Sequence, residues 1–466
     1  MGEQRTALIL LLILCFAVVS ISEIGTVKAE STIYIRADGS VEGTEMIQRD
    51  GNVYVFTDNF GGSIVVEKDD VVIDGGGYIL QGLGTGRGIE LLDRKNVTVR
   101  NFEIIHFEMG IYVFDYSEPR NNTISENIIT NNTYGLYIRN AHNNTIFSNT
   151  IANNEYGIFL LESRFNILKN NNLNNNSYSF FIDNTNFVND VDTSNLVDGK
   201  PMIYWVNQQD RTVPSESGYV ALINCKNITI RNLNLEKNAH AILLASTTDS
   251  TIAYNTITKN KKGIFLRNSS NNTVSWNTIT NNECGIRIQG GYPIYAPNNK
   301  VYGNIIENNN GCGISIRDSV NNTIYGNNMT NNECGISISS SKSPTNNIIH
   351  HNNFINNTEQ ASAPGWWHMV VFEEHWVPPA SNVWDDGEEG NYWSNYLTRY
   401  PNATEIDSYI WDTPYNISEN NQDNYPLMEP GPVIPEFPSW TILPILVAST
   451  FVIIVIRNKL RKKGLE

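Results

Sequence analysis

Short runs of alternating apolar and polar residues, each closed by asparagine or glycine, recur along this chain. The phrase NNTISENIITNNTYGLYI at residues 121–138 returns as NNTIFSNTIANNEYGIFL at residues 143–160. Further copies follow at a period of about 22 residues, within the range of known repeat architectures. Alternation over such short runs, closed by turn-forming residues, is typical of β-strands and not of helices. We therefore expect a repeat protein built from short strands.

The repeat predicts an all-β fold, a right-handed parallel β-helix in which each copy adds one turn of the coil. A leucine-rich repeat has a similar period but needs a leucine framework and a helical half. We expect roughly 10 to 11 turns. The coil should cover residues 69–358, with a longer excursion at residues 187–226 and an N-terminal cap segment at residues 30–68.

Asparagines that share one phase of the repeat should stack directly above one another. Buried amides in such a column can form hydrogen bonds along it, as in the asparagine ladders of stacked sheets. The alternative is that these asparagines only tolerate the left-handed backbone of a corner. Six residues share this phase and are expected to form an internal ladder: Asn127, Asn149, Asn255, Asn277, Asn304 and Asn327.

The two ends of the chain predict export and anchoring. Residues 1–29 contain one arginine, a long apolar stretch and a cleavage site with small residues, which is the pattern of a secretory signal peptide. Residues 440–456 are apolar and are followed by the basic tail 457–466, which should stay cytoplasmic. We expect an exported protein on the extracellular face of the membrane, held by this single C-terminal transmembrane segment. A proline-rich linker, residues 431–439, leads into the span.

Charge and sequons agree with an extracellular body. The net charge of -16 argues against nucleic acid as a partner, because binding to phosphates needs a basic face. Many corners are also N-x-[ST] acceptor sequences for glycosylation. The candidates are Asn96, Asn121, Asn131, Asn143, Asn175, Asn227, Asn268, Asn271, Asn321, Asn328, Asn356, Asn402 and Asn416.

Three further segments carry a family resemblance. They are IYIRADGSVEGTEMIQRDGNVYVF near the start, VDTSNLVDGKPMIYWVNQQDRTVPSESGYV in the middle, and the closing NYWSNY, DTPYNI and DNYPLMEP. These segments resemble archaeal cell-surface proteins of the NosD-like right-handed β-helix family, whose repeats belong to the CASH class of carbohydrate-binding proteins and sugar hydrolases. IPEFPSW before the span also resembles the signal of surface proteins processed by archaeosortases. This resemblance implies trimming of the span and reattachment of the body to a lipid.

Cysteines and histidines raise the question of a metal. Three cysteines, Cys284, Cys312 and Cys334, each precede a Gly-Ile pair in consecutive turns and should form an inward column. They can be buried thiols, contain one disulfide, or bind a soft metal such as copper. The family name adds copper maturation as an implication. The weak metal candidates also include His350, His351, His368 and His375, which lie with Met369 in one short stretch.

Six of the nine tryptophans lie between Trp366 and Trp411, in a C-terminal module of residues 359–430. If Trp384 and Trp393 are exposed, they form a sugar-stacking platform with Asp385 and Asp386. If they are buried, they cap the open end of the coil. The last two acids, with Glu388 and Glu389, are also weak oxygen ligands for calcium. Relatives carry an acidic run before TPY, of which this chain keeps only Asp412.

Three functions remain open at this point. The first is a cell-surface β-helix that binds extracellular or cell-wall carbohydrate. The second is a polysaccharide lyase or glycoside hydrolase, although the acids, among them Asp74, Glu103, Glu108 and Glu155, do not form the facing pair that sugar hydrolysis needs. The third is a NosD-like copper-maturation accessory. We place the carbohydrate-binding protein first and name no catalytic residue.

Overall fold

The computed structural model describes residues 31–116, 120–183, 187–291, 296–340, 345–370, 373–377 and 379–432. The predicted signal peptide, transmembrane segment and basic tail, and most of the linker, lie outside the described residues. Within these residues, no helix is long and apolar enough to cross a membrane.

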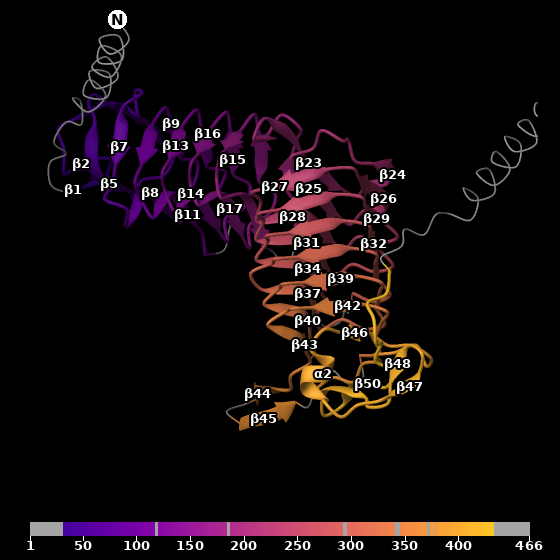
Figure 1. The fold of residues 1–466 in the computed structure, drawn as a ribbon. Helices are drawn as coiled ribbons and strands as arrows, with labels where there is room; N and C mark the ends of the chain where they lie inside the picture. Colours follow the sequence, from indigo (N-terminus) through magenta and orange to yellow (C-terminus); the bar gives the residue numbers. More distant parts are fainter. Residues whose placement is uncertain are drawn as a thin grey trace, which may run out of the picture. The chain divides into compact units, whose positions relative to one another are not determined.

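The chain forms two compact units, which we describe separately. Unit 1 comprises Met1–Ile228, Leu233–Thr248 and Ile257–Arg267, and unit 2 comprises Thr229–Asn232, Asp249–Thr256 and Asn268–Glu466. Figure 1 shows both units as stacks of short strands. The strands β26 (Lys226–Arg231) and β30 (Thr256–Thr258) contain residues of both units, and β27 (Asn234–Glu236) belongs to unit 1.

Three parallel sheets form the sides of the coil in unit 1. The first contains β1 (Ser31–Ile35), β5 (Phe60–Val66), β8 (Arg87–Leu92), β11 (Met109–Phe114), β14 (Tyr134–Arg139), β17 (Tyr156–Leu161) and β20 (Tyr178–Asp183). The second contains β4 (Val53–Phe56), β6 (Val72–Asp74), β9 (Thr98–Arg100), β12 (Thr123–Ser125), β15 (Thr145–Phe147), β18 (Ile167–Lys169) and β21 (Asp190–Val191). The third contains β7 (Ile79–Gln81), β10 (Glu103–Ile105), β13 (Ile128–Thr130), β16 (Thr150–Ala152), β19 (Asn172–Asn174) and β22 (Leu196–Val197).

Unit 2 repeats the same three-sided arrangement. One sheet contains β34 (Cys284–Gln289), β37 (Cys312–Arg317), β40 (Cys334–Ser339) and β43 (Glu359–Ser362). The second contains β29 (Thr251–Ala253), β32 (Thr273–Ser275), β35 (Lys300–Tyr302), β38 (Thr323–Tyr325) and β41 (Ile348–His350). The third contains β33 (Thr278–Thr280), β36 (Ile305–Glu307), β39 (Asn328–Thr330), β42 (Asn353–Ile355) and β46 (Tyr392–Trp393).

The predicted right-handed parallel β-helix is confirmed, with about 13 turns where the sequence predicts 10 to 11. The coil begins before residue 69, because β1 and β5 already pair in parallel within the predicted cap segment. That segment also holds β2 (Val41–Glu42), antiparallel to β1, and β3 (Ile47–Asp50), antiparallel to β4. These first turns lack the asparagine phrase and are therefore missed when copies of the phrase are counted.

The expected excursion at residues 187–226 is itself built of strands. β21 and β22 continue the coil of unit 1, and β22 then turns back into β23 (Lys200–Val206) as an antiparallel pair. From β23 a new parallel sheet grows through β25 (Tyr219–Ile223), β28 (His240–Ala245) and β31 (Lys262–Arg267). The edge strand β24 (Gln209–Thr212) connects β23 and β25. The regular pattern is thus interrupted by the antiparallel step.

Asparagine ladders stabilise the inside of the coil at its corners. In unit 2, the Asn277 side-chain amide donates to the Asn304 Oδ1 at 2.9 Å, and Asn304 donates to Asn327 at 2.9 Å. All six residues of the predicted ladder are at most 1% exposed, so the internal ladder is confirmed. Two further ladders, which the sequence analysis did not identify, run through Asn122, Asn144 and Asn166 and through Asn132, Asn154 and Asn176 in unit 1.

The C-terminal module closes the last turns of unit 2. Its elements are β44 (Trp366–Val370), β45 (Glu373–Val377), α2 (Tyr396–Arg399), β47 (Glu405–Asp407), β48 (Ile410–Trp411), β49 (Tyr415–Ser418) and β50 (Asn421–Asp423). The Trp393 ring stacks on Phe354 of the preceding turn at 4.4 Å and on Tyr415 at 4.1 Å. The aromatic core of the coil therefore continues into the module.

Candidate functional site

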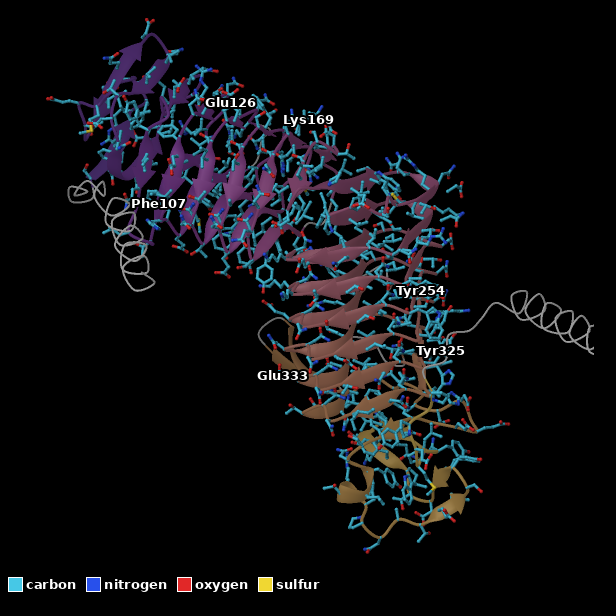
Figure 2. All side chains as sticks on the ribbon, turned by 45° about the horizontal axis from the view of Figure 1, so that its top comes forward. Phe107, Glu126, Lys169, Tyr254, Tyr325 and Glu333 are labelled. Atoms are coloured by element: carbon cyan, nitrogen blue, oxygen red, sulfur yellow. The ribbon has the colours of Figure 1, made fainter. Side chains whose placement is uncertain are left out.

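Aromatic side chains line one outer face of unit 2. Tyr254 follows β29, Trp276 follows β32, Tyr302 ends β35 and Tyr325 ends β38. We call these four residues the aromatic stripe. They occupy four successive turns, because β29, β32, β35 and β38 pair one after another in parallel. Figure 2 shows Tyr254 and Tyr325 on the same side of unit 2.

Trp276, Tyr302 and Tyr325 contact one another in series, and all four rings of the stripe are accessible. Trp276 meets Tyr302 edge-on, with ring centroids 5.7 Å apart, and Tyr302 stacks on Tyr325 at 4.9 Å. Tyr254 is 54% exposed, and the other three rings are half-buried. The stripe is therefore a row of aromatic side chains that face solvent, three of which are in direct contact.

Gly303 makes room for the tryptophan of the stripe. Its backbone has φ +64°, and a Cβ atom added there would lie 2.4 Å from the Trp276 indole. Any side chain at this corner would displace the ring. Because Gly303 has no side chain, the Trp276 indole can pack over the next turn.

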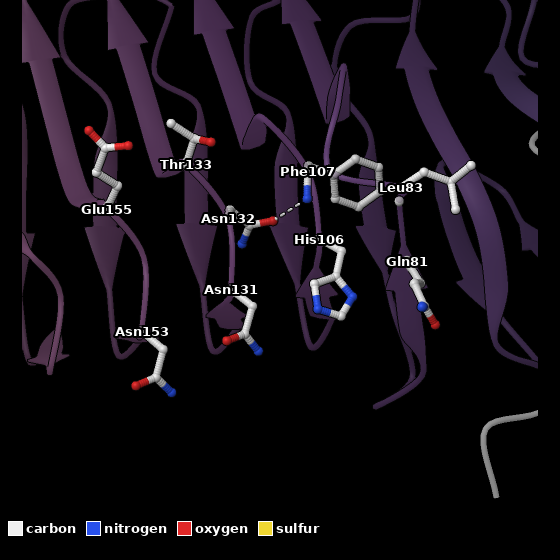
Figure 3. Close-up of a pocket in the computed structure, with 11 residues that line it drawn as sticks. Gln81, Leu83, His106, Phe107, Asn131, Asn132, Thr133, Asn153 and Glu155 are labelled. Carbon is white, nitrogen blue, oxygen red and sulfur yellow. Dashed lines mark hydrogen bonds between the residues drawn. The ribbon is translucent and has the colours of Figure 1, made fainter.

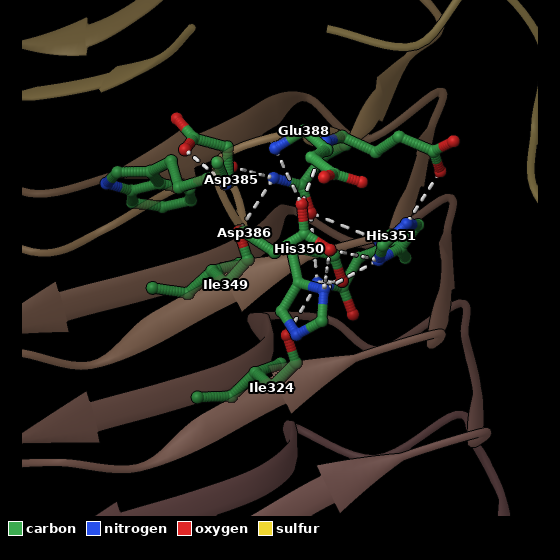
Figure 4. A network of polar contacts seen from close by, with 12 residues as sticks. Ile324, Ile349, His350, His351, Asp385, Asp386 and Glu388 are labelled. Atoms are coloured by element: carbon green, nitrogen blue, oxygen red, sulfur yellow. Dashed lines mark hydrogen bonds and ion pairs between the residues drawn. The ribbon is translucent and has the colours of Figure 1, made fainter. Parts of the chain in front are cut away.

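The next turn beyond Tyr325 carries a group of titratable side chains in place of another apolar ring. His350 stacks on Tyr325 with ring centroids 5.5 Å apart, and the Nδ1 atoms of His350 and His351 are 2.6 Å apart. Asp386 Oδ2 lies 3.8 Å from the His350 Nδ1 and 3.9 Å from the His351 Nδ1. Glu389 Oε2 accepts a hydrogen bond from His351 Nε2 at 2.7 Å. We define His350, His351, Asp386 and Glu389 as the histidine cluster, and Figure 4 shows the first three of these residues.

Local backbone geometry brings both histidines to the outer face. Successive residues of a strand point to opposite faces. His351 is beyond the end of β41 and has φ +55°, the left-handed corner conformation, so its ring lies beside that of His350. Burial and the neighbouring His351 lower the pKa of His350, which favours the neutral imidazole.

Asp386 is held in place by its own turn. Its Oδ1 accepts hydrogen bonds from the backbone N–H groups of Glu388 and Glu389 at 3.0 and 2.8 Å. Burial alone would raise the pKa of this carboxyl, but these bonds and the two histidines lower it. The Oδ1 atom of Asp386 thus accepts hydrogen bonds within the turn, while its Oδ2 atom faces the two histidines.

Comparison with known families agrees with this geometry. Residues 210–398, which contain the stripe and the histidine cluster, match the family described as "Periplasmic copper-binding protein (NosD)". Residues 71–213 match "Right handed beta helix region". The chain is a right-handed β-helix protein, and its residues 210–398 are similar to NosD proteins. Among curated proteins, none matches this chain.

Several solved structures share the β-helix at low similarity. The periplasmic alginate epimerase AlgG is 15% identical, with 70% of this chain and 79% of that chain covered and a TM-score of 0.29. The Azotobacter vinelandii mannuronan C-5 epimerase AlgE6 A-module is 14% identical, with 76% and 90% covered and a TM-score of 0.27. The Dettilon tailspike protein is 14% identical, with 57% and 60% covered and a TM-score of 0.24. Likeness at this level supports no inference about activity or ligand.

The structure corrects the predicted tryptophan platform of the C-terminal module. Trp384 and Trp393 are 0% and 1% exposed, so neither indole offers a face to a sugar at the surface. Their Nε1 atoms donate to Asn421 Oδ1 at 3.0 Å and to Asp423 Oδ2 at 2.8 Å. Both rings are part of the cap over the last turns, which was the alternative interpretation.

The other acids of the module have structural partners. Asp385 is 6% exposed and accepts a hydrogen bond from the Asn424 side chain at 2.9 Å. Asp412 accepts hydrogen bonds from the backbone N–H and the hydroxyl of Thr404 at 3.0 and 2.6 Å. Asp385 and Asp412 therefore stabilise turns. The side chains of His368 and His375, on β44 and β45, lie outside the described ones.

The cysteines do not form the inward column that the repeat predicts. Cys284 and Cys312 are half-buried and Cys334 is buried, at the first position of three long strands that otherwise carries outward residues such as Tyr134. Cys312 and Cys334 pair in register, and within the described residues none of the three cysteines, nor Cys225, forms a disulfide. The Cys312 thiol and burial raise the pKa of Cys334.

A shallow cleft of about 540 Å³ lies on unit 1 (Figure 3). His106 and Glu155 line it from different turns, both exposed, and the described residues show no hydrogen bond between these two side chains. Asp74, another acid weighed for catalysis, forms an ion pair with Arg100 at 2.8 Å and accepts a hydrogen bond from the Gly76 N–H. These residues do not assemble into an acid–base pair.

Unit 1 has its own aromatic cluster, but it is largely covered. Tyr134 stacks on Tyr156 at 5.0 Å, and Phe159 stacks on Phe181 at 4.0 Å. Tyr156 and Phe181 are 5% and 9% exposed, and they pack against Ala239. This cluster is therefore less suited to binding a ligand than the stripe.

Most predicted glycosylation acceptors face solvent. Ten are exposed, namely Asn96, Asn121, Asn131, Asn175, Asn227, Asn271, Asn321, Asn356, Asn402 and Asn416. Asn143, Asn268 and Asn328 are half-buried. The geometry permits modification at the exposed positions, and glycosylation stays a prediction.

The sequence contains a signal for the stripe. Each stripe residue stands one or two positions before a ladder asparagine, as in Tyr254-Asn255 and Trp276-Asn277. Five successive turns carry an aromatic ring or histidine at one of these two positions. Aligning the copies on the ladder residue, and not on the inward isoleucines, reveals the stripe.

Proposed function

We propose that this β-helix protein binds carbohydrate, and that a glycan chain lies along the aromatic stripe of unit 2. The observation that carries this proposal is the presence of four outward aromatic residues on four successive turns. Aromatic rings cover the apolar faces of pyranoses, so a row of them suits a row of sugar rings. Turns lie about 4.8 Å apart, so the stripe extends over roughly 14 Å. This length suits an extended polymer better than a single sugar.

Polar side chains beside the stripe supply hydrogen bonds to sugar hydroxyls. Residues two apart in a strand point to the same face. Thr273 therefore lies on the same face of β32 as Ser275, and Thr323 lies on the same face of β38 as Tyr325. Lys300 occupies the equivalent position of the strand between them. Hydroxyl and ammonium groups donate to sugar oxygens. The stripe thus combines an apolar surface with donors along one edge.

The charge of the chain favours a neutral glycan. The net charge of the chain is -16, so the protein as a whole repels polyanions. Lys300 is a single positive charge within the binding face and does not reverse this field. We therefore infer a neutral hexose polymer as the ligand class.

A glycan array probed with the full-length chain tests the proposal. Replacing both Trp276 and Tyr302 by Ala should weaken binding to neutral glycans at least tenfold, or about 1.4 kcal/mol. Gly303→Ala should weaken it as well, because its Cβ atom occupies the place of the indole. The matched control is Tyr409→Ala, which removes a ring of unit 2 that is 68% exposed and lies outside the stripe.

Unchanged affinity in the Trp276/Tyr302 double variant would rule out the stripe as the binding site. Binding only to sulfated or uronate glycans, with a steep salt dependence, would contradict the neutral ligand class. A cooperative melting transition of each variant shows that the coil remains folded. Equal losses in the Tyr409→Ala control would show that the effect is not specific to the stripe.

A further inference from the structure

The three facing atoms of the histidine cluster lie close enough together to bind one ion. The Nδ1 atoms of His350 and His351 are 2.6 Å apart, and Asp386 Oδ2 lies 3.8 and 3.9 Å from them. The point equidistant from these three atoms lies about 2.0 Å from each, which is the length of a zinc–imidazole or zinc–carboxylate bond. The cluster therefore encloses a position of the correct size for an ion.

Glu389 prepares His351 to act as a ligand. Its carboxylate accepts a hydrogen bond from His351 Nε2 at 2.7 Å, which assigns the proton to Nε2 and leaves a lone pair on Nδ1. Metal-ligating histidines commonly donate their second N–H to a carboxylate in this way. The Nδ1 lone pair then accepts the hydrogen bond from the His350 Nδ1 at 2.6 Å, and a bound ion would take the place of the shared proton.

The two segments that carry the ligands are fixed before any ion binds. The backbone N–H of His351 donates to the carbonyl oxygen of Gly390, which joins the end of β41 to the turn that carries Asp386. Asp386 closes that turn with its N–H on the Glu389 carbonyl oxygen at 3.0 Å. Binding an ion would therefore require little ordering of the chain.

We propose that His350 Nδ1, His351 Nδ1 and Asp386 Oδ2 bind one divalent first-row transition-metal ion, zinc or copper(II). Imidazole nitrogen with carboxylate oxygen suits both ions, whereas copper(I) prefers thiolate and thioether ligands. Three protein ligands leave a further coordination position open, as in zinc sites that bind an exchangeable group. Because His350 stacks on Tyr325, this position lies at the end of the aromatic stripe. The proposal does not depend on glycan binding.

Metal titration of the full-length chain tests this site. The chain is first stripped with a chelator and then titrated with zinc chloride or copper(II) chloride in a calorimeter. We expect one equivalent of either ion and, for copper(II), nitrogen hyperfine structure in the electron paramagnetic resonance spectrum. His351→Asn is the main variant, because asparagine keeps the left-handed corner while removing the imidazole. It should abolish binding, as should Asp386→Asn, and Glu389→Gln should weaken binding by about 10- to 100-fold.

Matched controls separate this site from other ligands in the chain. Cys312→Ser removes a thiol of unit 2, and His142→Ala removes a half-buried histidine of unit 1. Both variants should bind one equivalent with unchanged affinity. The proposal is overturned if the wild-type chain binds neither ion, or if His351→Asn binds as tightly as the wild type. It is equally overturned if Cys312→Ser, and not His351→Asn, loses the ion.

Discussion

At the scale of the residue, two neighbouring asparagines of one corner have different tasks. Asn131 is exposed and adopts the left-handed conformation at φ +56°, while Asn132 is 4% exposed and donates to Asn154 along a ladder. The two interpretations of the repeated asparagines, ladder and corner, therefore describe consecutive positions. This division explains why the repeat carries the doublet Asn-Asn.

Asn277→Ala should destabilise unit 2 strongly. The Asn277 side chain donates to the Ile252 carbonyl oxygen at 3.0 Å and to Asn304, and it accepts from the backbone N–H of Asn255 at 3.0 Å. Its removal leaves these buried groups without partners, at about 1 to 3 kcal/mol for each group. A loss of at least about 3 kcal/mol in the free energy of unfolding is therefore expected, measured by urea denaturation.

The control for this variant is Asn310→Ala, which changes an exposed asparagine of the same unit. Its effect should stay within about 0.5 kcal/mol, as is usual for surface positions. Equal stabilities of the two variants would show that the ladder bonds contribute little.

At the scale of the element, the sequence predicts the repeated strands well and the C-terminal module poorly. The isoleucines and asparagines of each copy face the same environment in every turn, so the pattern alone identifies the coil and its ladder. Trp393 gives no such signal, because burial or exposure of a ring in a unique segment depends on its neighbours in three dimensions. The histidine cluster likewise joins His350 to Asp386 across the intervening hairpin β44–β45. Sequence spacing does not indicate that contact.

Asp423 should make the module less stable as the pH rises. Burial raises the pKa of its carboxyl from 3.8 to about 7, although the N–H groups of Asn391, Trp393 and Tyr425 oppose this shift. The folded state binds the proton of the Asp423 carboxyl more tightly than the unfolded state does. The resulting stabilisation of the folded module is therefore fully present below about pH 4 and is lost as the pH rises to about 7. The expected decrease is at most about 4 kcal/mol.

Urea midpoints between pH 4 and pH 7.5, followed by near-ultraviolet circular dichroism of the stacked aromatic rings, measure this effect. Asp423→Asn does not titrate and should flatten the dependence. Glu388→Gln, which changes an exposed acid of the same module, should leave it intact. A slope that persists in Asp423→Asn would assign the effect to other groups.

At the scale of the whole molecule, the two apolar ends of the sequence predict on which side of the membrane the body of the chain lies. Residues 1–29 and 440–456 lie outside the described residues, so export and anchoring stay predictions from sequence. Protease added to intact cells should degrade the body of the chain and leave at most the short basic tail. A cytoplasmic marker protein should remain intact in the same sample. Full protection of the body would contradict export.

The ladders also have a consequence for how the chain folds. Many successive turns carry asparagines at the same positions, so a turn that pairs one period out of step would form nearly the same hydrogen bonds. The repeats thus specify the β-helix fold, but they do not specify which turn pairs with which other turn. The antiparallel β22–β23 step and the stack of Phe354, Trp393 and Tyr415 each fit at a single place. The correct alignment therefore depends on the least repetitive parts of the chain, and misaligned intermediates are the main hazard of its folding.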